Sequence, residues 1–168
     1  MNDLWLCLVQ FNNIGAGYLA LNKLSEKVTL CDFFCGESFS QIMYYGAPAD
    51  VEPTLLINNK EDVINAVVVK SHSFDVLDAY LSRNEYTVGS ELAIVESKSI
   101  CDLILLAEKA LLSSLTIIDF RQFRTDSFGG YLLISSNTEI NEKELSKDFP
   151  TVKMTVIKSS NIHLKNLL

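Results

Sequence analysis

The sequence has little of what several functional classes require. Its 168 residues hold 14 Lys and Arg against 21 Asp and Glu, for a net charge of −7, and no basic cluster suited to nucleic-acid phosphates. The longest apolar stretch, residues 103–118, contains Glu108 and Lys109 and is shorter than the roughly 20 apolar residues that span a bilayer. We therefore expect neither a nucleic-acid partner nor a membrane partner.

Basic residues are also missing before the first apolar run, where a secretory signal would carry them. We therefore expect a cytoplasmic protein, in which the four cysteines are reduced thiols. Histidines number only two, His72 and His163, and neither lies in a carboxylate pattern. The sequence thus predicts no catalytic triad and a protein that is not an enzyme.

An internal repeat is the strongest pattern that is present. Residues 6–10 (LCLVQ) align with residues 92–96 (LAIVE). Farther along, residues 28–33 (VTLCDF) align with residues 115–120 (LTIIDF). The order of the two segments is the same in both halves, which is typical of a duplicated folding unit.

A third segment extends the repeat through a polar loop. Residues 38–45 align with residues 127–134, after a loop that this alignment makes two residues longer in the second copy. Because three segments occur in one order, the chain is predicted to hold two domains, residues 1–84 and 85–168.

Each copy has the pattern of a strand, a helix and two further strands. Residues 28–33 and 41–45 lie too close together for a crossover helix, so they should form an antiparallel pair, as should 115–120 and 131–135. The predicted fold class is therefore α/β (α+β), with two tandem repeats that each hold an antiparallel sheet flanked by helices.

The clearest helix follows Ser99, which with Asp102 could form a capping box. An apolar stripe at helical spacing supports it: Ile100, Leu103, Ile104, Ala107, Ala110 and Leu111. Leu105, Leu106 and Leu112 fall off this stripe, so we expect part of that extra face to meet another subunit. Weaker patterns elsewhere predict helices over 58–69 and 139–147, strands over 67–70 and 152–158, and a helical turn or two over 75–81.

Residues 15–20 (GAGYLA) fit the dinucleotide-binding pattern G-x-G-x-x-G/A, with Asp32 at the end of the next strand. A nucleotide-binding enzyme that uses Gly15 and Gly17 is therefore one alternative. Two features oppose it: the following strand returns through a short loop, and the second copy has SKSICD in place of the glycines. In the other interpretation the glycines allow a tight helix start or a close helix contact.

Residues 92–98 (LAIVESK), 107–110 (AEKA) and 128–134 (FGGYLLI) resemble the first strand, the helix, and the pore loop with third strand of bacterial microcompartment shell domains. Two copies resemble the tandem-domain type of that family. The resemblance implies a homotrimer that forms a pseudohexameric disc in the cytoplasm, within a microcompartment wall. Its partners would be copies of itself, other shell proteins, and small polar metabolites that cross a central pore.

The resemblance also implies which residues line that pore. They are Cys35, Gly36, Glu37, Ser38, Arg124, Thr125, Asp126, Ser127, Phe128 and Gly129. The charged members, Glu37, Arg124 and Asp126, would set the electrostatic field at the pore mouth. Shell proteins that tile into sheets usually carry a lysine just after the first helix, along the edge of the disc. In this sequence that position falls at or beside Leu112 in the second copy and near Glu26 in the first, so the resemblance implies a trimer but not an extended facet.

Residues 35–39 (CGESF) resemble the pore loop of the iron–sulfur member of the tandem shell proteins. This resemblance implies a second alternative, an electron-transfer protein in which Cys35 of three chains holds a [4Fe–4S] cluster. Otherwise no cofactor is expected. The spacing of Cys31 and Cys35 is not a standard zinc spacing, and Cys7, Cys31 and Cys101 are predicted to be structural.

Overall fold

The computed structural model describes residues 4–71, 74–123 and 128–158. The sequence features at His72, His163 and residues 124–127 lie outside this part of the chain. The chain divides into two compact units, Met1–Ser73 and Phe74–Leu168. Within the described ranges, no helix is both long enough and apolar enough to span a membrane.

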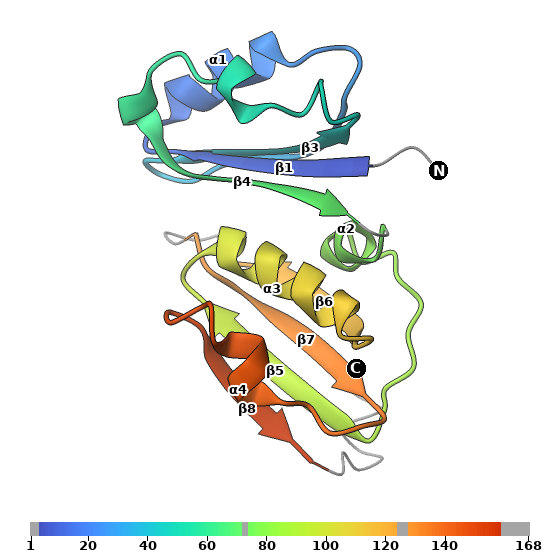
Figure 1. Ribbon diagram of the computed structural model, residues 1–168. Helices are drawn as coiled ribbons and strands as arrows, with labels where there is room; N and C mark the ends of the chain where they lie inside the picture. The colour runs from blue at the N-terminus through green and yellow to red at the C-terminus, as the bar shows by residue number, and fades with distance from the viewer. Residues whose placement is uncertain (1–3, 72–73, 124–127, 159–168) are drawn as a thin grey trace. The chain divides into compact units, whose positions relative to one another are not determined.

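The first unit is a four-stranded antiparallel sheet with one long helix across a face (Figure 1). Its elements are β1 (Leu4–Phe11), α1 (Ile14–Lys23), β2 (Thr29–Cys35), β3 (Ser40–Gly46), the 3-10 turns η1 (Pro53–Leu55) and η2 (Lys60–Asp62), and β4 (Val63–Ser71). The strand order is β2-β3-β1-β4. Helix α1 packs on β1 and β3, and small residues such as Ala16 and Ala20 line its buried side.

The second unit repeats this arrangement. Its elements are α2 (Asp75–Tyr80), β5 (Glu91–Ser97), α3 (Ile100–Leu112), β6 (Thr116–Gln122), β7 (Gly130–Ser136), α4 (Glu142–Ser146) and β8 (Lys153–Ile157). The strand order is β6-β7-β5-β8, so each strand has a counterpart at the same place in the first sheet. The predicted fold class, two antiparallel sheets with flanking helices, is confirmed.

Both hairpins carry a bulge at the same position of the repeat. The register of β2 on β3 shifts between Leu30 and Asp32, and that of β6 on β7 shifts between Ile117 and Asp119. Since bulges redirect the side chains that follow them, their repetition shows that the alignment of 28–33 with 115–120 holds residue by residue.

The alignment of the third segment was wrong by one residue. Ile42 pairs with Phe33 and Leu132 pairs with Phe120, so Ile42 corresponds to Leu132 and not to Tyr131. Nine positions separate the first pair and twelve the second, which makes the second loop three residues longer. The alignment had been guided by the two Ser-Phe dipeptides. Ser38 and Phe39 lie in the loop between β2 and β3, and a slip of one residue in a strand exchanges its two faces.

The predicted helix and its Ser99 cap are confirmed, but the reciprocal half of the capping box is absent: the Ser99 N–H donates to the Ser97 hydroxyl at 3.0 Å, and the Asp102 carboxylate accepts from Thr151 at 2.8 Å. The Ser99 hydroxyl accepts a hydrogen bond from the backbone N–H of Asp102 at 3.2 Å, and α3 begins at Ile100. Leu106, expected off the core stripe, is fully buried, whereas Leu105 and Leu112 are 38% and 65% exposed. A helix with apolar residues on most of its circumference is typically buried on most of that circumference. The predicted stripe was therefore narrower than the face that α3 buries.

The helix predicted over 58–69 was wrong, because only Lys60–Asp62 forms a 3-10 turn and strand β4 begins at Val63. Val63, Ile64 and the valines of 67–69 are β-branched, which favours a strand that pairs with β1. The shorter elements α2, α4 and β8 lie within the ranges predicted for them.

The two compact units divide between Ser73 and Phe74, upstream of the boundary that the sequence placed after residue 84. Residues near that boundary contact the second sheet. The Asn84 side-chain amide donates to the carbonyls of Ile117 and Ile118 at 2.9 and 3.0 Å, and the Tyr80 hydroxyl donates to Gln122 at 2.9 Å. Residues 75–84 therefore pack with the second unit.

Candidate functional site

The first predicted pore loop is the tip of the β2–β3 hairpin. Cys35 pairs with Ser40, and the backbone N–H of Gly36 donates to the carbonyl of Phe39 at 3.0 Å. Glu37 and Ser38 therefore form the turn, and both are exposed. The carboxylate of Glu37 is thus presented to solvent by a short, closed hairpin.

Aromatic packing fixes this hairpin to its unit. Phe39 is buried, and the edge of its ring meets Phe34 with centroids 5.5 Å apart. A Cβ at Gly36 would overlap the Phe39 ring, so glycine here lets the phenylalanine fold under the turn. The packing of Phe34 and Phe39 thus holds the exposed turn of Glu37 and Ser38 against the sheet.

The second hairpin has a longer tip. The backbone N–H of Phe123 donates to the Gly129 carbonyl at 2.8 Å and closes the hairpin, while Arg124, Thr125, Asp126 and Ser127 lie outside the described residues. The Phe128 carbonyl accepts from Ile100 at the start of α3. Gly129 is buried, and a Cβ there would meet the Ser97 carbonyl, so glycine allows the close approach of these two backbone segments.

The cysteines occupy three kinds of environment, and none forms a disulfide. Cys7 and Cys101 are buried, and burial raises the pKa of the Cys7 thiol to about 12. Cys31 lies at the β2 bulge and is half-buried, whereas its counterpart Ile118 is buried, so Cys31 is less deeply packed than the same position of the second copy. Cys35 is the last residue of β2, and partial burial raises its thiol pKa.

One chain does not bring metal ligands together in the part that the structure describes, where no three His, Cys, Asp or Glu side chains could share an ion. Cys35 would therefore supply a single thiolate per chain. A cluster there requires the same residue from other chains.

The glycine motif does not have the geometry of a dinucleotide site. That site needs neighbouring parallel strands joined by the helix, whereas β1 and β2, although they run in the same direction, are separated by β3, which is antiparallel to both. Gly15 and Gly17 are both inside α1, and the N-cap is Asn13, whose side chain accepts from Ala16 at 2.7 Å. At Gly17 a Cβ would overlap the Ser40 side chain. The packing interpretation of the glycines accounts for this, and the structure gives no support to the nucleotide-binding enzyme.

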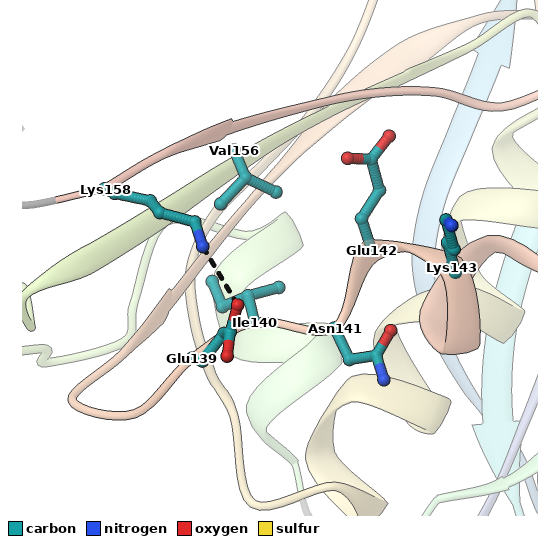
Figure 2. A pocket seen from close by; sticks show the side chains of 7 residues that line it. All are labelled: Glu139, Ile140, Asn141, Glu142, Lys143, Val156 and Lys158. Carbon is teal, nitrogen blue, oxygen red and sulfur yellow. Dashed lines mark hydrogen bonds and ion pairs between the residues drawn. The ribbon is translucent and has the colours of Figure 1, made fainter.

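Figure 2 shows a pocket that the sequence did not predict, between the segment that leads into α4 and strand β8. Lys158 and Glu139 form an ion pair at 2.9 Å on its rim, and this pairing lowers the pKa of Glu139. Asn141 caps α4 by accepting from Glu144. Its lining has carboxylates and lysines but no Ser, Thr, Cys or His, and Glu139 and Lys158 pair with each other, so this pocket shows no arrangement of an acid, a base and a nucleophile.

No protein-family model and no curated protein matches this sequence. Its structure is similar to the crystal structure of a microcompartments protein from Desulfitobacterium hafniense DCB, with a TM-score of 0.78 over 98% of this chain and 99% of that chain. The chain has a microcompartment-protein fold. The two sequences are 19% identical, so the likeness establishes the architecture alone.

A second solved structure, of a protein proposed to be a glycine cleavage system transcriptional repressor, has a TM-score of only 0.33 at 11% identity, over 93% of this chain and 98% of that one. The microcompartment-protein fold confirms the architecture that the resemblance of residues 92–98 and 128–134 implied.

Proposed function

We propose that this chain is a structural, non-catalytic subunit of a bacterial microcompartment shell. Three copies would assemble into a disc of six similar domains, and small polar metabolites would pass through its centre. The observation that carries the proposal is the likeness to a microcompartments protein over 98% of the chain. Two units with the same strand order also suit a threefold ring, because cyclic symmetry then repeats six similar units.

Exposed apolar side chains at repeated positions support self-assembly. Ile14 and Ile100 are the first residues of α1 and α3. Counted from these residues, Leu19 in α1 is the counterpart of Leu105 in α3. These leucines are 55% and 38% exposed. A chain that forms a ring from alternating units would use each of them at a similar contact, and burial there would remove apolar surface from water.

In this disc the hairpin tips would line the pore. Glu37 and Ser38 are solvent-exposed at the first tip, and Arg124 to Ser127 would occupy the second. Carboxylate and guanidinium groups around a narrow opening would favour small polar solutes over apolar ones. Other shell proteins would be neighbours at the edge of the disc.

Native mass spectrometry tests the assembly. We expect the wild-type chain to have the mass of three copies, and the double variant Leu19→Asp/Leu105→Asp to shift towards monomer, since a carboxylate in an apolar contact loses its hydration. Leu112→Asp is the matched control, because the counterpart of Leu112 in the first copy is Glu26, so a carboxylate already occupies this position of the repeat. It should remain trimeric. A monomeric wild-type chain at working concentration would refute the ring.

The position of Cys35 favours one further candidate, an electron-transfer role within the same trimer. Cys35 lies two residues before Glu37 of the hairpin turn and is half-buried, so three copies could meet where the tips converge. Three thiolates would hold three irons of a [4Fe–4S] cluster, which carries one electron at a time. The raised thiol pKa of the single chain means that thiolate formation would depend on the metal.

Anaerobic purification distinguishes this candidate. A cluster gives visible charge-transfer absorption and bound iron, and both should be lost in Cys35→Ser while the trimer persists. Cys31→Ser, in the same strand, should retain them. A wild-type trimer that is colourless and free of iron would remove the electron-transfer role and leave the shell role standing.

A further inference from the structure

A second pocket, of about 360 Å³, lies on the second unit at strands β6 and β7. Its apolar side includes Ile118 and Leu133, which form a buried cluster with Leu92. Its polar side includes Asp119, Arg121 and Tyr131. This volume lies at the small end of the range for ligand pockets, which combine an apolar wall with a few convergent polar groups.

The arginine is held in a fixed position. Its Nε donates to Asp119 at 3.0 Å, and the Tyr131 hydroxyl donates to the same carboxylate at 3.2 Å. The backbone N–H of Phe120 donates to the other oxygen of Asp119 at 3.0 Å. Asp119 is thus occupied with orienting its neighbours, and it engages the guanidinium through Nε, while the two terminal nitrogens carry further N–H donors.

Arg121 is also accessible and permanently charged. Its side chain is 51% exposed, and the hydrogen bond to Asp119 raises its pKa. A guanidinium with a fixed plane suits the two oxygens of a carboxylate, which it can bind through parallel N–H···O hydrogen bonds. The pocket therefore presents an anion-binding group beside an apolar wall.

Asn84, which also lines the pocket, adds a different polar group. Both hydrogens of the Asn84 amide are used by the carbonyls of Ile117 and Ile118, at 2.9 and 3.0 Å. Asn84 can therefore offer a ligand only its side-chain oxygen, which is an acceptor. A hydroxyl or amino group on the ligand would match it.

The first unit has no equivalent pocket chemistry, although the backbone is the same. Phe34 pairs with Gln41 where Arg121 pairs with Tyr131 in the second unit, and Asp32 stands in for Asp119. The arginine and tyrosine thus belong to the second copy alone and are not required by the shared fold. A function specific to the second unit accounts for this difference.

We propose that this pocket binds a small organic carboxylate with a compact apolar body. Arg121 binds the carboxylate, Ile118 and Leu133 contact the apolar body, and Asp119 with Tyr131 positions the guanidinium. All of these residues belong to one unit, so the site needs no residue from another chain.

Ligand-detected NMR titration of the full chain with benzoate tests the site, with benzamide as the neutral analogue of similar shape. We expect saturable benzoate binding that is at least about tenfold tighter than benzamide binding, because a charge-assisted pair is lost in the amide. Arg121→Gln should reduce benzoate affinity to the benzamide level. Arg121→Lys, which keeps the charge without the fork, should lie between them.

Two control variants locate the effect. Arg83→Gln removes a nearby exposed cation that pairs with Asp78 outside the pocket, and Lys158→Gln removes the cation of the pocket in Figure 2. Both should bind benzoate as the wild type does. The proposal is overturned if benzoate does not saturate, if Arg121→Gln binds it unchanged while melting like the wild type, or if Lys158→Gln is the variant that loses binding.

Discussion

Replacing Gly17 with valine is expected to lower the free energy of unfolding by about 2 kcal/mol or more, the cost of forcing a branched side chain into a packed contact. Gly17 lies where α1 approaches β3, and a Cβ there would overlap Ser40. Ser40 cannot move aside cheaply, because it is fully buried and its hydroxyl donates to the Asn13 carbonyl at 2.7 Å. Urea denaturation followed by circular dichroism measures the change.

Gly15→Ala is the matched control for this prediction. Gly15 lies in the same helix, is exposed, and a Cβ there would have only Asn13 Oδ1 nearby, at the ordinary contact distance of 3.4 Å. Alanine should leave stability unchanged or raise it by about 0.5 kcal/mol, because it restricts the unfolded chain. Equal losses in Gly15→Ala and Gly17→Val would contradict the packing role.

The same pair of variants addresses the nucleotide hypothesis. A dinucleotide fingerprint needs its first glycine for the turn and its second for close approach of a pyrophosphate, so both changes would weaken NAD binding. We expect no saturable NAD binding to the wild-type chain. Saturable binding that Gly17→Val abolishes would reopen that hypothesis.

Much of the fold was predictable because the repeat gives two independent sequence segments for each strand of the hairpins and for the first strand and helix. Residues 28–33 contain a bulge that no periodicity reveals, yet their alignment with 115–120 was right, because both copies carry the same Asp-Phe pair after it. The weak point was the loop. Its length differs between the copies, and the strand that follows could be placed only after backbone pairing was known.

Strand β4 and Leu106 show the other limit of the sequence. Residues 58–69 have apolar residues at spacings that suit either a helix or a strand, and pairing with β1 decides between them. Leu106 lies off the apolar stripe of α3, but burial depends on what covers the helix and not on its own periodicity. Tertiary contacts thus determine both the strand conformation of β4 and the burial of Leu106.

The candidate sites divide in the same way. The hairpin at Cys35 to Ser38 could be located from the resemblance, because it lies between two strands that are recognisable in sequence. The pocket at Arg121 could not, because it needs β6 and β7 in register. One sequence feature was available: Asp119 lies in the strand predicted over 115–120 and Arg121 directly follows that strand, and residues two apart in a strand share a face.

Replacing Phe120 with alanine is expected to cost about 3–5 kcal/mol of stability, the range for removing a buried aromatic ring. Phe120 is fully buried in β6, and its ring meets the edge of Tyr80 with centroids 5.4 Å apart. The repeat provides its own control in Phe33, the same position of β2. That ring is only half-buried and packs on Tyr18, which is itself exposed.

Phe33→Ala should therefore lower the free energy of unfolding by less, about 1–2 kcal/mol, because the Phe33 ring buries less apolar surface than the Phe120 ring. Hydrogen exchange can assign each loss to its unit, because local opening exposes the amides of the destabilised sheet first. Phe120→Ala should accelerate exchange in β5, β6 and β7, and Phe33→Ala in β1, β2 and β3. Equal costs would mean that the two copies depend on this ring alike, and that the deeper burial of Phe120 contributes nothing to the stability of its unit.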